Sequence, residues 1–174
     1  MKKSEPIKLD LGCGTRKQPG FLGVDAIEFV GVDLVHDLRK KWPWKSGSVS
    51  EVFSSHFVEH LTGAERVHFV NELYRVLEPK GKATIIVPHW SNACAYGDPT
   101  HQWPPMSEWF ALYLDKGWRA VNAPHTGYDC DFEYIVGFGF DERVMAFNDE
   151  RRQFALAHHL NAARDMYLTL TKRV

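Results

Sequence analysis

Cysteine is scarce in this chain, and the three that it has show no paired spacing. Cys13, Cys94 and Cys130 form neither a CxxC metal knuckle nor a disulfide framework. Long apolar runs are absent too: none approaches the roughly 20 residues that cross a bilayer, and no charged-then-apolar leader opens the sequence. We therefore expect free thiols, a cytoplasmic location and no membrane partner.

The sequence also lacks an excess of one charge. Its net charge is −1 over 174 residues, whereas a protein that binds duplex nucleic acid usually carries a basic face. The basic-aromatic stretch Arg39–Trp44 is short enough to be interpreted as a solvated turn, so nucleic acid is disfavoured as a partner. Hydrophobic residues make up 44%, which indicates a packed core. The length suits one domain covering residues 1–174.

Short apolar runs alternate with helical or loop stretches, a pattern typical of an α/β sheet. Thr62-Gly-Ala-Glu65 is a capping box and predicts a helix whose apolar stripe runs to Leu77. Pro79 and Gly81 then stop that helix before the buried strand 83–87. A second helix is predicted at 150–163, with Phe154, Ala157 and Leu160 on one side. The other predicted strands cover 7–11, 21–27, 29–34, 49–54, 133–140 and 166–171.

Between about residues 89 and 126 the composition changes, because prolines, glycines and aromatics crowd together. We interpret this stretch as an insertion lying over one end of the sheet. Its tryptophans, Trp90, Trp103, Trp109 and Trp118, could form either an aromatic wall around an organic ligand or the small core of the insertion.

Asp10-Leu-Gly-Cys-Gly14 is a glycine-rich loop directly after the first predicted strand. Glycines there let the backbone approach a ligand without Cβ clashes. The third glycine of the dinucleotide fingerprint is missing, since Lys17 stands in its place, and no Gly-Lys-Ser/Thr follows. Asp10 suits a ligand that carries ammonium and sulfonium charges better than it suits a pyrophosphate.

The loop resembles the first motif of the class I S-adenosylmethionine-dependent methyltransferases, and four further segments resemble later motifs in the same order. These segments are Gly23–Asp25, Val35–Leu38, Ser54–Leu61 and Leu73–Gly81. The resemblance covers roughly residues 7–88. It implies a Rossmann-like, doubly wound α/β fold, with a seven-stranded sheet that is mostly parallel and an antiparallel last strand. It also implies S-adenosyl-L-methionine as the cofactor.

Carried over residue by residue, the resemblance implies that the carboxylate at the end of the second strand binds the ribose of the cofactor. The end of the third strand would border the adenine, and the segment after the fourth strand would lie beside the methionine part. The implied cofactor-binding residues are Asp10, Gly12, Cys13, Gly14, Asp25, Ala26, Asp37, Leu38, Ser55 and His56.

The chain departs from the family pattern between Gly14 and Phe21, which leaves little room for the usual crossover helix. Either that helix is reduced to a turn, or the second strand is 29–34 and Asp33 is the ribose ligand. We favour Asp25, with Asp33 and Asp37 then in one strand and Asp37 at its end.

Candidates for a general base or an acceptor-binding group follow the fourth and fifth strands. They are His56, His60, His89, Asp98 and His101. Histidine titrates near neutral pH and can take a proton from an alcohol or amine. His56 and His60 also have a structural interpretation as helix-start or packing residues, and Asp98 and His101 as parts of a capped turn. No metal is expected, because Glu59-His60 lacks the H-E-x-x-H arrangement and His89 with His101 is too loosely spaced.

The sequence therefore predicts a methyltransferase (EC 2.1.1.-) that acts on an O or N atom of a small-molecule or sugar-type acceptor. Alternatives are a protein or nucleic-acid methyltransferase, and a non-catalytic subunit that keeps the fold. The Asn/Asp-Pro-Pro-Tyr/Phe motif of amino-methylating DNA enzymes and the Pro-Cys of C5-cytosine enzymes are both missing. The oligomeric state stays open, with a homodimer or a larger complex both compatible.

Overall fold

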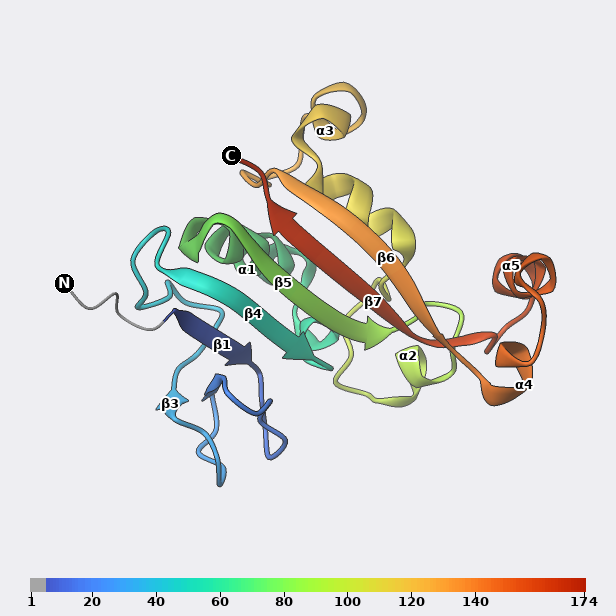
Figure 1. Cartoon of the computed structure of the whole chain (residues 1–174), viewed down its shortest axis with the longest axis horizontal. Helices are drawn as coiled ribbons and strands as arrows, with labels where there is room; N and C mark the ends of the chain where they lie inside the picture. The colour runs from blue at the N-terminus through green and yellow to red at the C-terminus, as the bar shows by residue number, and fades with distance from the viewer. Residues whose placement is uncertain (1–5) are drawn as a thin grey trace.

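The structure, a computed structural model, describes residues 6–174. Its strands form a single sheet (Figure 1). The strands are β1 Ile7–Leu11, β2 Leu22–Asp25, β3 Leu34–Val35, β4 Val49–Ser55, β5 Leu77–Pro88, β6 Phe132–Phe140 and β7 Ala163–Lys172. The helices are η1 Val58–His60, α1 Gly63–Val76, α2 Cys94–Gly97, η2 Glu108–Leu114, α3 Lys116–Asn122, α4 Glu142–Met145 and α5 Asp149–His158.

The sheet has seven strands in the order β3-β2-β1-β4-β5-β7-β6. Neighbours from β3 to β5 are parallel, whereas β7 runs antiparallel to both β5 and β6. The predicted fold class, a mostly parallel Rossmann-like sheet with an antiparallel last strand, is therefore confirmed. In such a sheet the parallel strands end at one edge, where ligands bind.

The core lies between the sheet and helix α1. Leu9, Val52 and Ile85 from three neighbouring strands belong to one buried cluster with Phe69 and Leu73 of the helix, and each is at most 1% exposed. A fully buried side chain of this size contributes roughly 1.5–3 kcal/mol. The packing fixes the carboxyl ends of β1 and β4 relative to each other.

Helix α1 begins as the capping box predicts. The Thr62 side chain accepts from the Glu65 N–H, and the Glu65 carboxylate accepts from the Thr62 N–H at 2.8 Å. Two first-turn donors are thus satisfied, which sets the start of the helix that follows η1.

Replacing Thr62 by Ala should therefore lower the free energy of unfolding by about 1 kcal/mol, because an N–H at the helix start loses its acceptor. Urea denaturation measures this loss. Thr62→Ser is the matched control, since it keeps the hydroxyl, and it should stay near wild type. Equal losses in both variants would show that the methyl group rather than the cap matters.

The predicted strand 29–34 is wrong. Only Leu34–Val35 pair with β2, and residues 26–33 form turns and bends. Gly31 has φ +100°, and the Asp33 carboxylate accepts from the Gly23 N–H at 2.7 Å. Turn interactions of this kind take the place of the strand-to-strand backbone hydrogen bonds that were predicted there. Asp33 precedes the short strand and Asp37 lies beyond it, which corrects the expectation that both share one strand.

The predicted helix 150–163 is shorter than expected, since α5 ends at His158 and Asn161 adopts φ +60° in the following turn. Its expected apolar side does not face the core: Phe154 is 56% exposed and Leu160 74%. Ala155 is the residue that α5 buries.

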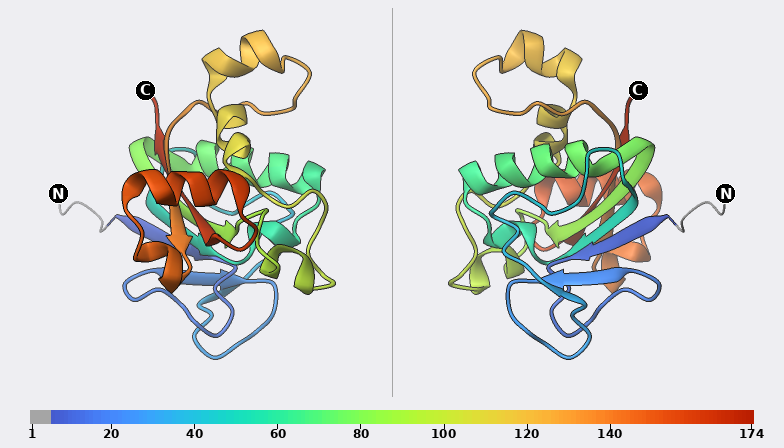
Figure 2. Two further views of the ribbon diagram at one scale, coloured as in Figure 1. Left: turned by 90° about the vertical axis from the view of Figure 1, so that its right-hand side faces the viewer. Right: turned by 90° about the vertical axis from the view of Figure 1, so that its left-hand side faces the viewer.

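No helix connects β1 to β2, so the crossover is the reduced one considered above. In Figures 1 and 2, α1 lies behind the sheet, and no helix of the described chain crosses the front of β1 and β4. That front face carries the ion pair Lys8–Glu51 and the edge-on ring contact between Phe21 and Phe53. The crossover loop, residues 12–21, is what covers β1 there.

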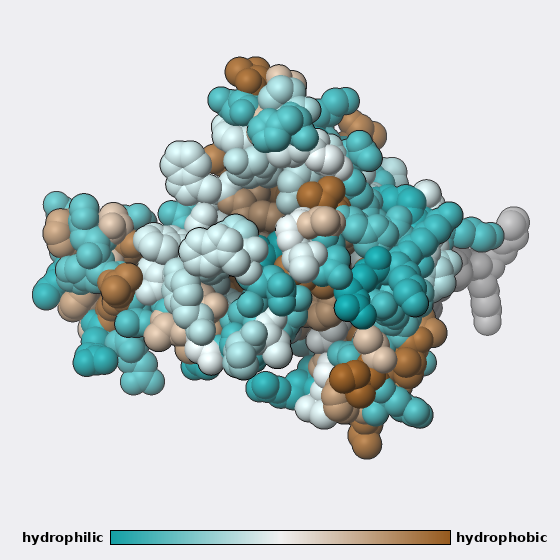
Figure 3. All heavy atoms as spheres, turned by 180° about the vertical axis from the view of Figure 1, so that it is seen from behind, coloured by the Kyte–Doolittle hydropathy of each residue, from teal (hydrophilic) through white to brown (hydrophobic). Residues whose placement is uncertain are grey.

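The stretch predicted as an insertion contains α2, η2 and α3, and α3 projects away from the sheet (Figure 2). The residues that it contributes to the buried core cluster are Met106, Ala111 and Leu114. Trp103 and Trp109 are 77% and 65% exposed, so they do not form a core of this segment. The face behind the sheet mixes hydrophilic and hydrophobic residues (Figure 3). Among residues 6–174, no helix is long and apolar enough to span a membrane.

Candidate functional site

The loop after β1 takes a shape that requires glycine. Gly12 and Gly14 have φ +72° and +50°. A Cβ on Gly12 would lie 2.3 Å from the Phe57 ring, whereas a Cβ on Gly14 would meet no atom within 4 Å. The amides of Gly12 and Cys13 both donate to the Val24 carbonyl. The loop therefore offers space beside the strand ends rather than unpaired amides.

A cavity of about 480 Å³ opens beside this loop, at the carboxyl ends of β1 and β4. Its volume lies within the usual range for a small-molecule site. The structure brings six of the predicted cofactor residues to its wall: Asp10, Gly12, Cys13, Gly14, Ser55 and His56. Five lining residues were not predicted: Thr15, Arg16, Gln18, Phe29 and Phe53.

Asp10 is the acidic group of this cavity. Its side chain accepts from the Gln18 N–H at 2.6 Å, and the residue is only 2% exposed. Burial raises the pKa of this carboxyl above its ordinary value. A cation bound nearby would favour the ionised form. The neighbouring Cys13 thiol, whose pKa burial raises to about 11, stays protonated and is no nucleophile at neutral pH.

Asp25 ends β2, and its carboxylate accepts from the Gly14 N–H at 2.9 Å and from the Ile27 N–H at 3.0 Å. It therefore contacts the cavity loop without lining the cavity itself, and neither it nor Ala26 forms part of the wall. Asp33, the alternative ribose ligand, is bound instead to Lys17 at 2.8 Å and to the Gly23 amide.

Asp37 and Leu38 are also outside the cavity wall. The Asp37 carboxylate pairs with Arg39 at 2.9 Å, and this bond lowers the pKa of Asp37. Leu38 is buried in the core, where its carbonyl accepts from the Trp42 indole at 3.0 Å. Their contact with the adenine stays a prediction.

His56 is the one predicted catalytic residue that lines the cavity. It follows β4 directly and adopts φ +53°, an uncommon conformation for a residue with a side chain. Its Nδ1 lies 3.2 Å from Glu59 Oε1, and its Nε2 lies 3.7 Å from Asp165 Oδ1 on β7. The turn thus holds the ring between the cavity and the start of β7.

His60, Asp98 and His101 lie together although 40 residues separate the two histidines. The two rings meet edge-on with centroids 4.8 Å apart. Thr100 joins them, since its hydroxyl contacts His60 Nδ1 at 2.9 Å and donates to Asp98 Oδ1 at 2.7 Å. These residues border Glu59 and hence His56, but they do not line the cavity beside the glycine loop.

His89 lies apart from that group. It is 1% exposed, with Nδ1 2.8 Å from Ser91 Oγ and Nε2 3.4 Å from Glu108 Oε2. Burial lowers the pKa of this imidazole, and Glu108 offsets part of that effect. These contacts hold the His89 ring in the interior, and His89 does not line the cavity beside the glycine loop.

The lowered pKa of His89 predicts how stability responds to pH. Near and below its unfolded pKa of about 6.5, the unfolded chain binds a proton that the folded chain resists. The His89 contribution should thus make stability fall as the pH falls from 7 towards 5. Urea midpoints across that range measure it, and His89→Gln should flatten the slope. An unchanged slope in the variant would contradict the prediction.

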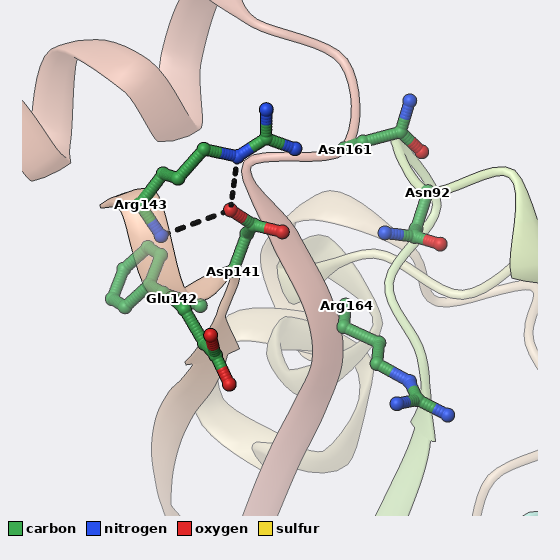
Figure 4. A pocket seen from close by; sticks show the side chains of 7 residues that line it. Asn92, Asp141, Glu142, Arg143, Asn161 and Arg164 are labelled. Atoms are coloured by element: carbon green, nitrogen blue, oxygen red, sulfur yellow. Dashed lines mark hydrogen bonds and ion pairs between the residues drawn. The ribbon is translucent and has the colours of Figure 1, made fainter. Parts of the chain in front are cut away.

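A second cavity, of about 600 Å³, lies where β6 and β7 meet the turn after α5 (Figure 4). Six of the seven residues in its wall are polar or charged; the wall consists of Asn92, Phe140, Asp141, Glu142, Arg143, Asn161 and Arg164. Asp141 pairs with Arg143 at 3.2 Å. Arg164 directly precedes Asp165, the carboxylate near His56.

Comparisons with known proteins agree with the fold described above. Residues 34–85 match the family model described as a methyltransferase domain. A SAM-dependent methyltransferase from Archaeoglobus fulgidus is 19% identical, with a TM-score of 0.68 over 96% of this chain and 86% of that one. Phosphoethanolamine N-methyltransferase 2 from Haemonchus contortus, solved with S-adenosyl-L-methionine, is 14% identical, with a TM-score of 0.52 over 100% of this chain and 50% of that one.

A putative methyltransferase from Haloferax volcanii, solved in complex with the Trm112 methyltransferase activator, is also similar. The identity is 14% and the TM-score 0.57, over 97% of this chain and 82% of that one. A comparison with curated protein sequences found no match to this chain.

The strand order and the reversed β7 define the fold, and the matched domain agrees with it. The chain has the fold of a class I S-adenosylmethionine-dependent methyltransferase, as its motifs predicted. S-adenosyl-L-methionine is the cofactor of that class, in line with the cofactor that the motifs implied.

Proposed function

We propose that this protein is a methyltransferase that binds S-adenosyl-L-methionine beside the loop Asp10–Gly14 and methylates an O or N atom of a small-molecule or sugar-type acceptor. The cavity at the carboxyl ends of β1 and β4 is the observation that carries the proposal, because it joins a buried carboxylate, two glycines and His56 in one wall.

The residues present suit this cofactor. Asp10 can attract its ammonium or sulfonium charge, and open space at Gly14 lets the ligand approach the backbone. Asp25 can accept from the ribose hydroxyls, since each carboxylate oxygen has a second lone pair beyond its bond to Gly14 or Ile27. Phe29 and Phe53 offer aromatic surface on which adenine can stack.

The acceptor would enter from the side of His56. When bound, the cofactor supplies an activated methyl group, so the protein mainly has to align the acceptor atom and exclude water. The polar cavity of Figure 4 lies beyond Asp165, and its amides, carboxylates and guanidinium groups suit a ligand rich in hydroxyls. His56 is placed to contact the acceptor atom, and His60, Asp98 and His101 support the segment behind it.

We further propose that the protein works in the cytoplasm as a single catalytic domain, with residues 89–126 on its substrate side. The three cysteines, all free, suit a reducing compartment. A subunit of a larger assembly is the second candidate. It is favoured by the sheet face that no helix covers, since parallel sheets are normally covered on both faces. The Haloferax relative was solved with an activator.

Ligand-induced thermal shifts test the proposal. A ligand at 100 times its dissociation constant should stabilise the wild type by about 2.7 kcal/mol. S-adenosylmethionine and its demethylated product should do so, and NAD should not. In Asp25→Ala most of this gain should disappear, because the ribose loses its acceptor.

Asp33→Ala is the matched control. Asp33 also accepts a backbone N–H near β2, but it lies on the Lys17 side, outside the cavity wall. It should keep the full ligand-induced shift whatever its own melting temperature. If the ligand-induced thermal shift were lost in Asp33→Ala and kept in Asp25→Ala, Asp33 rather than Asp25 would be the ribose ligand. If the wild type showed no ligand-induced shift, the proposal would be wrong.

A further inference from the structure

The cluster beside His56 contains a buried carboxylate without its full set of partners. Glu59 is 5% exposed, and its Oε1 faces His56. Its Oε2 is buried and has no hydrogen-bond partner among the described residues. An ionised oxygen in that state is costly unless a proton donor or a cation compensates it.

Two imidazoles lie next to this carboxylate. One ligand atom each from Glu59, His60 and His101 can be chosen so that all lie within 4.8 Å of one another. In a tetrahedral zinc site with bonds of about 2.1 Å, ligand atoms are roughly 3.4 Å apart, so modest side-chain rotations would close the gap.

The hydrogen bonds of the two histidines fix which ring nitrogen is free. The single Thr100 hydroxyl proton goes to Asp98 Oδ1, so Thr100 Oγ1 must accept from His60 Nδ1–H. His101 Nδ1 faces the Ala95 carbonyl at 3.1 Å, which can only accept. In both rings Nε2 therefore keeps its lone pair.

This arrangement is the one that outer-shell partners impose on metal-binding histidines. Such residues usually donate their second N–H to a carboxylate, a carbonyl or another oxygen, which fixes the ring and its tautomer. Here His101 uses a backbone carbonyl, and His60 uses a hydroxyl backed by a carboxylate.

The two segments that carry these residues are also tied together. The Gln102 N–H donates to the Glu59 carbonyl at 2.9 Å. The Arg66 guanidinium, itself 5% exposed, bonds to the carbonyls of both Glu59 and Gln102. The site is thereby held by the backbone rather than by the side chains alone.

We propose that Glu59, His60 and His101 bind a divalent transition-metal ion of the zinc type, one per chain. Two neutral imidazoles and a carboxylate are a donor set that zinc accepts, and three protein ligands leave one position open. The sequence disfavoured a metal because Glu59-His60 lacks a second histidine at short spacing; the fold instead brings His101 next to His60 from a distant part of the chain. Through Glu59 the ion would lie next to His56, at the edge of the cofactor cavity.

Calorimetric titration of Zn²⁺ into chelator-treated protein tests this site without any need for cofactor or turnover. We expect one Zn²⁺ per chain and no comparable binding of Mg²⁺, which prefers oxygen ligands. His101→Ala should weaken Zn²⁺ binding at least 100-fold. His158→Ala is the matched control, since His158 is an exposed histidine on α5, and it should leave the affinity unchanged.

Thr100→Val tests the outer shell, because it keeps the side-chain shape and removes the acceptor of His60 Nδ1–H. It should weaken Zn²⁺ binding about 10–100-fold. Circular dichroism checks that each variant is folded, and if His101→Ala is not, Thr100→Val decides alone. The proposal is overturned if the wild type takes up no Zn²⁺, or if the folded variants bind it as tightly as wild type. Either result leaves the thermal-shift test of S-adenosylmethionine unaffected.

Discussion

Gly14→Ala is expected to abolish stabilisation by S-adenosylmethionine while the protein stays folded. At φ +50° an alanine costs about 1 kcal/mol of stability. Its methyl group meets no protein atom within 4 Å, so it would occupy the open space of the cavity that Gly14 lines. In the wild type, ligand at 100 times its dissociation constant should stabilise the fold by about 2.7 kcal/mol. In Gly14→Ala this stabilisation, and the thermal shift that reports it, should fall to near zero.

Gly47→Ala separates backbone strain from blocked binding. Gly47 has φ +68° and equally open surroundings, but it lies in the turn before β4, away from the cavity wall. It should lose a similar amount of intrinsic stability and keep the whole ligand-induced shift. If Gly14→Ala bound the cofactor as well as Gly47→Ala does, the ligand could not lie against the loop.

Arg66→Ala should cause the largest loss of stability among the variants considered. The buried guanidinium donates to the carbonyls of Val58 and Glu59 in η1 and of Gln102 and Pro104 in the aromatic stretch. Removing it leaves several buried acceptors unpaired, so we expect the free energy of unfolding to fall by about 3 kcal/mol or more. The urea midpoint, at an unchanged m value, measures this.

Arg39→Ala is the control for removing a charge. The Arg39 side chain is 56% exposed and bonds to Asp37 on the surface, where ion pairs contribute little. Its midpoint should stay close to that of the wild type. Equal midpoints in the two variants would mean that Arg66 does not hold the segments together.

Local signals along the chain predicted much of the fold. Strands β1, β4 and β6, the capping box at Thr62 and the loop from Gly12 to Gly14 were all recognisable, because their signals lie within a few consecutive residues. The strand predicted at 29–34 failed because its apolar residues sit in turns: Val30 is 95% exposed. The spacing of apolar residues in the sequence cannot predict the φ of +100° that Gly31 adopts in the structure.

The site was predicted less completely than the fold. Arg16 and Gln18 reach the cavity because the shortened crossover folds back over β1, and Phe53 reaches it because side chains alternate along β4. Alternation was the one signal that could have identified Phe53, which is two residues before Ser55. Nothing local links His60 to His101, since their proximity depends on how the segment after β5 returns to η1.

The most direct test of this account is a crystal structure grown with S-adenosylhomocysteine at saturating concentration. We predict the ligand in the cavity beside Gly12 and Gly14, with its ribose hydroxyls on the Asp25 carboxylate and its sulfur facing His56. A cavity filled by the protein's own side chains, or a ligand bound elsewhere with Asp25 still bonded only to Gly14 and Ile27, would contradict it.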